Sequence, residues 1–69
     1  MSVRFNLVMS DDLNNAIDKA AEETETNKSV ILRKALQMYL AARDGHQRGL
    51  KVGLVEPETL KMQTEFIGL

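Results

Sequence analysis

The first stretch of the chain, residues 2–9, alternates with a period of two. One set of side chains is apolar and comprises Phe5, Leu7 and Met9, whereas the other set comprises Ser2, Arg4, Asn6 and Val8. This period is typical of a β-strand that has one buried face and one exposed face. No second strand follows directly in the sequence. The simplest prediction is therefore that the strand pairs with its own copy in a second subunit, as a two-stranded antiparallel ribbon.

A first amphipathic helix is predicted after this strand. Ser10 is a good N-cap residue, and the acidic Asp11 and Asp12 follow it in the first turn. Apolar residues then recur at steps of three and four from Leu13 to Thr24, which predicts a helix of roughly fourteen residues. The helix has one apolar packing stripe and an ordinary polar surface.

A turn and a second helix are predicted next. Glu25 occupies the place where a glycine often ends a helix, and either Thr26 or Asn27 caps the helix that follows. The second helical pattern, from Val30 to Ala42, is apolar around nearly its whole circumference, and Gly45 is suited to end it.

One neighbouring helix cannot cover such a surface, so the fold class predicted is mainly α, an intertwined homodimer with an N-terminal two-stranded ribbon. Its apolar core is predicted to contain Phe5, Leu7, Met9, Leu13, Ile17, Ile31, Leu32, Ala35, Leu36 and Tyr39.

The composition changes after Gly45. Residues 46–49 are predicted to be a short linker, and residues 56–59 a turn in which Pro57 takes the first central position. Alternating patterns on both sides of that turn predict a β-hairpin or two extended segments. We expect residues 1–45 to form a dimerisation domain, whose binding partner is considered below, and residues 46–69 a C-terminal tail. The apolar residues with which the tail would bind a partner are Leu50, Val52, Leu54, Leu60, Met62 and Phe66.

The composition narrows the class of protein. The 69 residues hold no cysteine and one histidine, His46, so we expect no disulfide, no metal site and no cofactor. No nucleophile–base pair or glycine-rich phosphate loop is visible, and we do not expect an enzyme. No apolar run approaches the roughly 20 residues that span a bilayer, and the protein is expected to be cytoplasmic.

The net charge of −1 is unusual for a nucleic-acid-binding domain, but the charges are segregated. Acidic residues gather in or just after the first helix. The basic residues Arg4, Lys28, Arg33 and Lys34 lie on the strand and at the beginning of the second helix.

The strand and the turn carry the candidate chemistry. A two-stranded ribbon fits the major groove of DNA, where Arg4 can bind guanine, Asn6 can bind adenine, and Val8 can contact a thymine methyl group. The free amides at the start of the second helix, near Asn27, Lys28 and Ser29, would bind an anion such as a DNA phosphate. Taken alone, the polar strand face is explained as a solvent-exposed face of an edge strand, and Asn27 is explained as a helix cap. Taken together, the two features favour DNA binding by residues 1–45.

Residues 4–10 and 27–35 resemble the strand and the second-helix entry of the ribbon-helix-helix repressors of the Arc, MetJ and CopG type. The resemblance covers residues 2–43. It implies an intertwined homodimer, base reading by Ser2, Arg4, Asn6 and Val8, and phosphate contact by the amides of Lys28 and Ser29. Val8 and Glu25 depart from the family pattern, which commonly has a polar base reader and a glycine at these positions.

Two functions follow as hypotheses. The first is a homodimeric, sequence-specific repressor, with higher assembly on operator DNA possible. Family members are often plasmid or phage regulators or antitoxins, and the tail could bind a toxin or complete the fold as a hairpin. The alternative is a protein-interaction module without DNA binding, in which the first strand pairs with residues 60–67.

Overall fold

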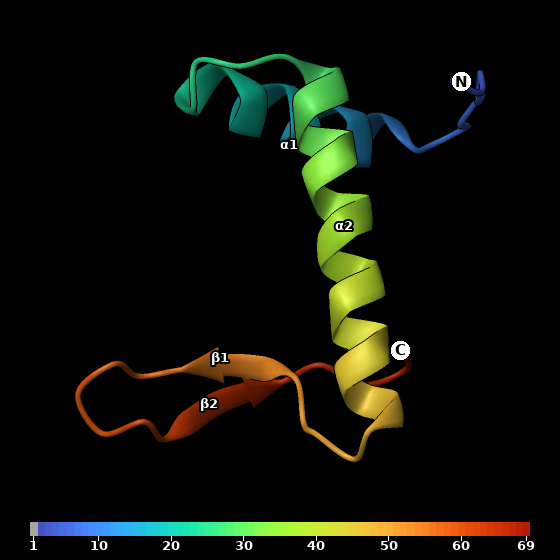
Figure 1. Ribbon diagram of the computed structural model, residues 1–69. Helices are drawn as coiled ribbons and strands as arrows, with labels where there is room; N and C mark the ends of the chain where they lie inside the picture. The colour runs from blue at the N-terminus through green and yellow to red at the C-terminus, as the bar shows by residue number, and fades with distance from the viewer. Residues whose placement is uncertain (1) are drawn as a thin grey trace. The chain divides into compact units, whose positions relative to one another are not determined.

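The computed structural model describes residues 2–69, which form two helices followed by a two-stranded antiparallel sheet (Figure 1). The chain divides into two compact units between Arg33 and Lys34. In chain order, the elements are α1 (Asp11–Glu23), α2 (Lys28–Gln47), β1 (Gly53–Val55) and β2 (Met62–Glu65).

Helix α1 begins and ends as the sequence predicts. The hydroxyl of Ser10 accepts a hydrogen bond from the amide of Leu13 at 3.1 Å, which confirms Ser10 as the N-cap. At the other end, the amide of Thr26 donates to the carbonyl of Ala21 at 2.8 Å, and Glu25 has a φ of 56°. These are the features of a Schellman motif, which places Glu25 in the left-handed position expected for it. A residue with a Cβ destabilises that position by about 1–2 kcal/mol.

Helix α2 begins at the predicted cap but extends beyond the predicted end. The side-chain oxygen of Asn27 accepts from the amide of Val30 at 3.1 Å, so the cap is Asn27 and not Thr26. The prediction that Gly45 ends the helix is wrong, because α2 continues to Gln47. The predicted linker at residues 46–49 therefore begins inside the helix.

A second Schellman motif explains where α2 stops. Gly49 has a φ of 85°, its amide donates to the carbonyl of His46, and the amide of Leu50 donates to the carbonyl of Gly45, both at 3.0 Å. Gly45 is buried in a helical position, with Leu50 beside it. The left-handed glycine is thus Gly49, four residues after the one chosen from the sequence.

The hairpin predicted for the tail is present. Gly53 pairs with Glu65 and Leu54 pairs with Thr64, but Val55 pairs with Met62, so the register shifts by one residue. This shift is a β-bulge, and it reverses the alternation of faces along β2.

The turn of the hairpin holds Leu60 outside the strands. The amide of Leu60 donates to the carbonyl of Glu56 at 2.8 Å, and Leu60 has a φ of 58°. The alternation predicted that Leu60 lies on a strand face, and this is wrong. Leu60 is a residue of the turn.

Within residues 2–69, a single chain buries almost none of its apolar side chains. Among residues 2–69, Ala21 is the one buried apolar residue. Of the predicted dimer core, four residues are half-buried, namely Met9, Ile17, Ile31 and Leu32. The others are exposed, namely Phe5, Leu7, Leu13, Ala35, Leu36 and Tyr39. The folded chain therefore presents a large apolar surface.

Candidate nucleic-acid interface

Residues 2–9 are exposed along nearly their whole length and form no strand within the described chain. Phe5 is 74% exposed and Leu7 is 52% exposed, and the residues of the other set, Ser2, Arg4, Asn6 and Val8, are exposed as well. Both sets of side chains in this segment, apolar and polar, are therefore exposed to solvent. The segment has the alternation of a strand but no partner strand within residues 2–69.

The alternative pairing of this segment with residues 60–67 is not found. Strand β2 pairs with β1, and the described sheet has only these two strands. The hairpin closes through its own turn, which supplies β2 with the adjacent strand. The alternative function therefore loses the strand pairing on which it was built.

The start of α2 offers free backbone donors. Asn27 caps the helix through its side chain and its carbonyl, and the carbonyl accepts from the amides of Val30 and Ile31. Within residues 2–69, the amides of Lys28 and Ser29 donate to no protein acceptor. Free amides at the positive end of a helix attract anions. The phosphate site expected at these amides stays a prediction.

The side chain of Lys28 is bound to α1. Its Nζ atom donates to Oδ1 of Asn14 at 2.6 Å and lies 3.2 Å from Oδ1 of Asp18. Both ends of this ion pair are partly exposed, so it adds little to stability. It holds the ammonium group beside α1, whereas the backbone amide of Lys28 donates to no acceptor within residues 2–69.

This contact was not foreseen from the sequence. Asn14 and Asp18 lie one helical turn apart, and Nδ2 of Asn14 is 3.5 Å from Oδ2 of Asp18. Residues four apart share a face of a helix, which was the available signal. The sequence could not indicate that this face lies against the beginning of α2.

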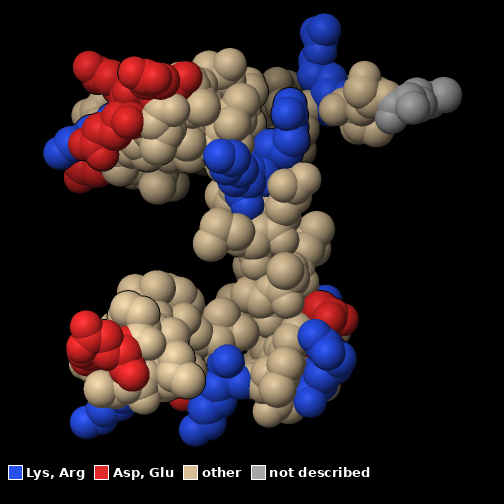
Figure 2. All heavy atoms as spheres, turned by 60° about the vertical axis from the view of Figure 1, so that its left-hand side comes forward, with Lys and Arg blue, Asp and Glu red and all other residues tan. Residues whose placement is uncertain are grey.

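The charges of the N-terminal unit are segregated in space as in sequence. Figure 2 shows acidic side chains of this unit gathered in one patch, with most of the basic side chains apart from them. Within α1, Lys19 pairs with Glu23 at 3.9 Å between two well-exposed side chains. Such a pair contributes little, and the acidic face of α1 is best explained as a solvated surface.

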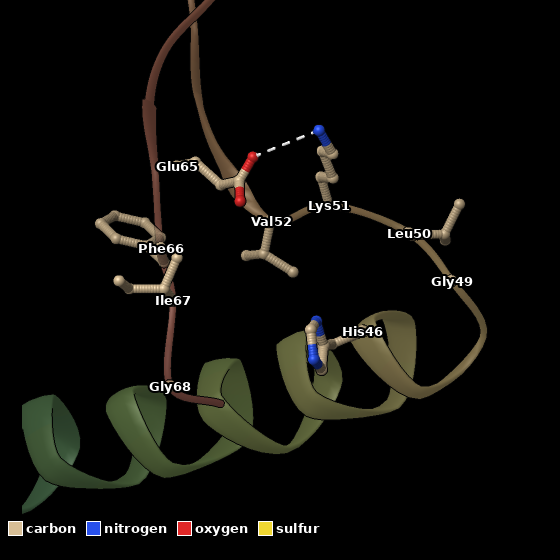
Figure 3. Close-up of a pocket in the computed structure, with 9 residues that line it drawn as sticks. All are labelled: His46, Gly49, Leu50, Lys51, Val52, Glu65, Phe66, Ile67 and Gly68. Atoms are coloured by element: carbon tan, nitrogen blue, oxygen red, sulfur yellow. Dashed lines mark ion pairs between the residues drawn. The ribbon is translucent and has the colours of Figure 1, made fainter.

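The C-terminal unit contains a hollow of about 290 Å³ between the hairpin and the last turns of α2. In Figure 3, the side chains of Val52 and His46 point toward one another, and Lys51 and Glu65 form an ion pair at 3.7 Å. Phe66 and Ile67, which follow β2, also line the hollow. The lining is apolar with one ion pair, and no cluster of catalytic groups is formed there.

The residues predicted for partner binding divide into two sets. Val52 and Met62 are half-buried, whereas Leu50, Leu54, Leu60 and Phe66 are exposed. Val55 and Ile67 are also exposed and were missed, because the prediction followed strict alternation. The adjacent pairs Leu54–Val55 and Phe66–Ile67 break that alternation and were the available signal.

No helix within residues 2–69 combines the length and the hydropathy needed to cross a membrane. Over the same residues, no three acidic or histidine side chains form a group that could hold a metal ion.

Comparison with known proteins gives one match. Residues 3–43 match a family model described as "Ribbon-helix-helix protein, copG family". The matched residues include the predicted strand, α1 and most of α2, and they make up more than half of the chain. No curated protein and no solved structure matches the chain.

Proposed function

Because this chain belongs to the CopG family of ribbon-helix-helix proteins, we propose that it is a homodimeric, sequence-specific repressor of transcription. Proteins of this family are usually DNA-binding transcription regulators, form dimers and are not enzymes.

The exposure of residues 2–9 is the observation that carries the proposal. Phe5 and Leu7 lie on the face that a ribbon buries, and both are exposed in the single chain. A second copy would pair with this segment, cover its apolar face and satisfy its backbone groups. Each of the two chains would then contribute one Arg4 and one Asn6 to the exposed face of the ribbon.

This outer surface has the chemistry to read bases in the major groove. Arg4 can donate two hydrogen bonds to O6 and N7 of guanine, and Asn6 can pair with N6 and N7 of adenine. Val8 offers a methyl contact to thymine, and Ser2 offers a hydroxyl. Twofold symmetry of the dimer would place the same side chains on two half-sites of an operator.

Phosphate contacts would hold the ribbon in its groove. The free amides of Lys28 and Ser29 at the start of α2 are suited to a phosphate oxygen, with Asn27 as the cap beside them. Asp18 and Asn14 hold the Lys28 side chain and thereby brace the beginning of α2. The dimer would carry two such sites.

Substitution of Arg4 and Asn6 tests the reading face. Arg4→Ala and Asn6→Ala leave the thermal midpoint nearly unchanged, because both side chains are exposed in the single chain and lie on the outer face of the proposed ribbon. Each substitution weakens binding to the operator by about 1–3 kcal/mol for every base that the side chain would read, and the dimer contains the site twice. Mobility shift on the DNA upstream of the gene measures this weakening, with a scrambled duplex as reference.

Lys34→Ala is the matched control for the removal of one positive charge. It should weaken binding to operator and scrambled DNA to the same small extent, because a general charge effect carries no sequence information. Operator binding by Arg4→Ala that equals the wild type would exclude this reading face.

A second candidate function is that of an autoregulatory antitoxin that binds a toxin with residues 46–69. The exposed apolar side chains of the hairpin favour it, since they are suited to a protein partner. Co-expression with the protein encoded beside this gene is the test. A stable complex that Phe66→Ser abolishes would support an antitoxin, and the absence of any complex would remove this function.

A further inference from the structure

Lys28 is the first residue of α2, and its side chain carries a positive charge at the start of that helix. The Cα–Cβ bonds of a helix tilt toward its N-terminus, so a first-turn side chain extends toward the end where the free amides lie. A lysine at this position is suited to place its ammonium group on an anion that those amides bind. In the structure, however, the ammonium group of Lys28 has a different partner.

Two side chains of α1 hold the ammonium group. The Nζ atom of Lys28 donates to Oδ1 of Asn14 at 2.6 Å and lies 3.2 Å from Oδ1 of Asp18. The Nδ2 atom of Asn14 also donates to Oδ2 of Asp18 at 3.5 Å, so the carboxylate is itself held in place. All three residues belong to the same compact unit. The positive charge at the start of α2 is therefore balanced by a carboxylate of α1.

The ion pair is accessible to solvent. The side chain of Lys28 is 41% exposed, and that of Asp18 is 53% exposed. A pair so exposed contributes little to the stability of the fold. Its larger effect is on the ammonium group, because a carboxylate and a DNA phosphate compete for the same charged donor.

We propose that Asp18 is a positioning residue that withholds the Lys28 ammonium group from DNA phosphates, so that the phosphate at the start of α2 is bound by backbone amides alone. The inference rests on the DNA-binding repressor of the proposed function. A contact from neutral amides fixes the orientation of the protein on DNA, whereas the salt-dependent part of binding comes from lysine and arginine side chains that neutralise phosphates. Asp18 thereby keeps sequence-independent binding weak.

The charge of the whole chain supports this role. The formal net charge is −1, so the chain has no excess of positive charge with which to bind DNA of any sequence. The pairing of Lys28 with Asp18 removes one more positive charge from each protomer. Weak binding to the many other sites of a genome leaves more of the dimer for its operator.

Asp18→Asn in the full chain releases the ammonium group. Asparagine keeps the size of the side chain and one carbonyl oxygen but loses the negative charge, so a phosphate becomes the stronger partner of Lys28. Binding to a scrambled duplex, measured by fluorescence anisotropy over a range of salt concentrations, should become several-fold tighter at low salt. The plot of log affinity against log salt should steepen by about 0.9 for each phosphate gained, or about 1.8 for the dimer.

Glu22→Gln is the matched control for the loss of one negative charge from α1. Glu22 is exposed and forms no ion pair within residues 2–69. This variant should keep the wild-type slope, because it releases no ammonium group.

Lys28→Gln completes the cycle and separates the outcomes. Alone, it should leave the slope unchanged, and in the Asp18→Asn background it should restore the wild-type slope. A shallower slope for Lys28→Gln alone overturns the inference, even if Asp18→Asn does not fold, because the ammonium group would already contact phosphate. A wild-type slope for folded Asp18→Asn also overturns it, as does a steeper slope that Lys28→Gln does not reverse.

The wild-type protein tests the proposed function separately. A wild-type chain that binds neither the DNA upstream of its gene nor the scrambled duplex overturns the proposed function and this inference with it. A wild-type chain that binds the upstream DNA more tightly than the scrambled duplex keeps the proposed function, whatever the slopes of the variants are.

Discussion

An alternating pattern predicted strands both at residues 2–9 and at the hairpin, residues 53–65, but only the hairpin pairs within residues 2–69. The hairpin pairs within the chain, because the turn with Pro57 brings β2 back beside β1. Residues 2–9 lead straight into the cap of α1, so no turn can return the chain to them. A period of two therefore predicts a strand, but the element that follows decides whether its partner comes from the same chain.

The two regions also differ in how their apolar side chains are covered. The sulfur of Met62 lies over Gly53 across the hairpin, and Met62 is half-buried. Phe5, by contrast, is 74% exposed. The hairpin pairs its own two strands, whereas the apolar face of the N-terminal segment has no cover within residues 2–69.

Phe5→Ala should have the largest effect, because it removes the largest side chain of the segment that cannot pair by itself. A buried Phe replaced by Ala destabilises a protein by about 3–5 kcal/mol, and the dimer contains the site twice. We expect loss of the dimer and a thermal midpoint that falls by many degrees, measured by circular dichroism at two protein concentrations. Arg4→Ala, one position away on the other face, is the control. A Phe5→Ala chain with the wild-type midpoint would show that the segment needs no partner.

Gly53→Ala should open the hairpin and leave the N-terminal half folded. A Cβ at this position would overlap the carbonyl oxygen of Thr64 and lie 2.9 Å from the sulfur of Met62. Overpacking of this kind costs about 1–3 kcal/mol. Amides of Glu56 and Phe66 should lose protection in hydrogen exchange, whereas those of α1 keep it. Unchanged protection at Glu56 and Phe66 would mean that the strands are not packed so closely.

Gly45→Ala should have a smaller effect of opposite sign, and it is the matched control for the added methyl group. Its Cβ would lie 3.9 Å from Cδ1 of Leu50, an ordinary contact. Alanine in a helix interior is more stable than glycine by about 0.5–1 kcal/mol. Urea unfolding at one fixed protein concentration should show this gain. A decrease in stability instead would restore Gly45 as the end of α2.

The helices and their caps could be predicted from the sequence to a large extent. Ser10 and Glu25 were placed correctly because capping depends on residues close in sequence. The end of α2 was placed wrongly because both Gly45 and Gly49 are suited to a helix end. Choosing between them requires the contact of Leu50 with Gly45, which the sequence pattern does not contain.

The candidate site could be predicted only where its residues are local. Asn27 as the cap and the free amides after it follow from one short turn. The attachment of Lys28 to Asp18 depends on how α2 begins against α1, and the position of Leu60 depends on a bulge and a turn. The ribbon and its base contacts stay predictions, because they require a second chain.

For a dimeric repressor of the kind proposed, the near absence of buried apolar side chains within residues 2–69 of a single chain has a consequence for gene control. A newly made chain that has not met its partner exposes much of α2 and the N-terminal segment, and quality-control proteases recognise such surfaces. Slow synthesis would then yield mostly degraded chains, and faster synthesis would yield lasting dimers. The half-life in the cell should lengthen as expression rises, which pulse-chase labelling can measure. A repressor of this kind would switch on above a threshold of its own production.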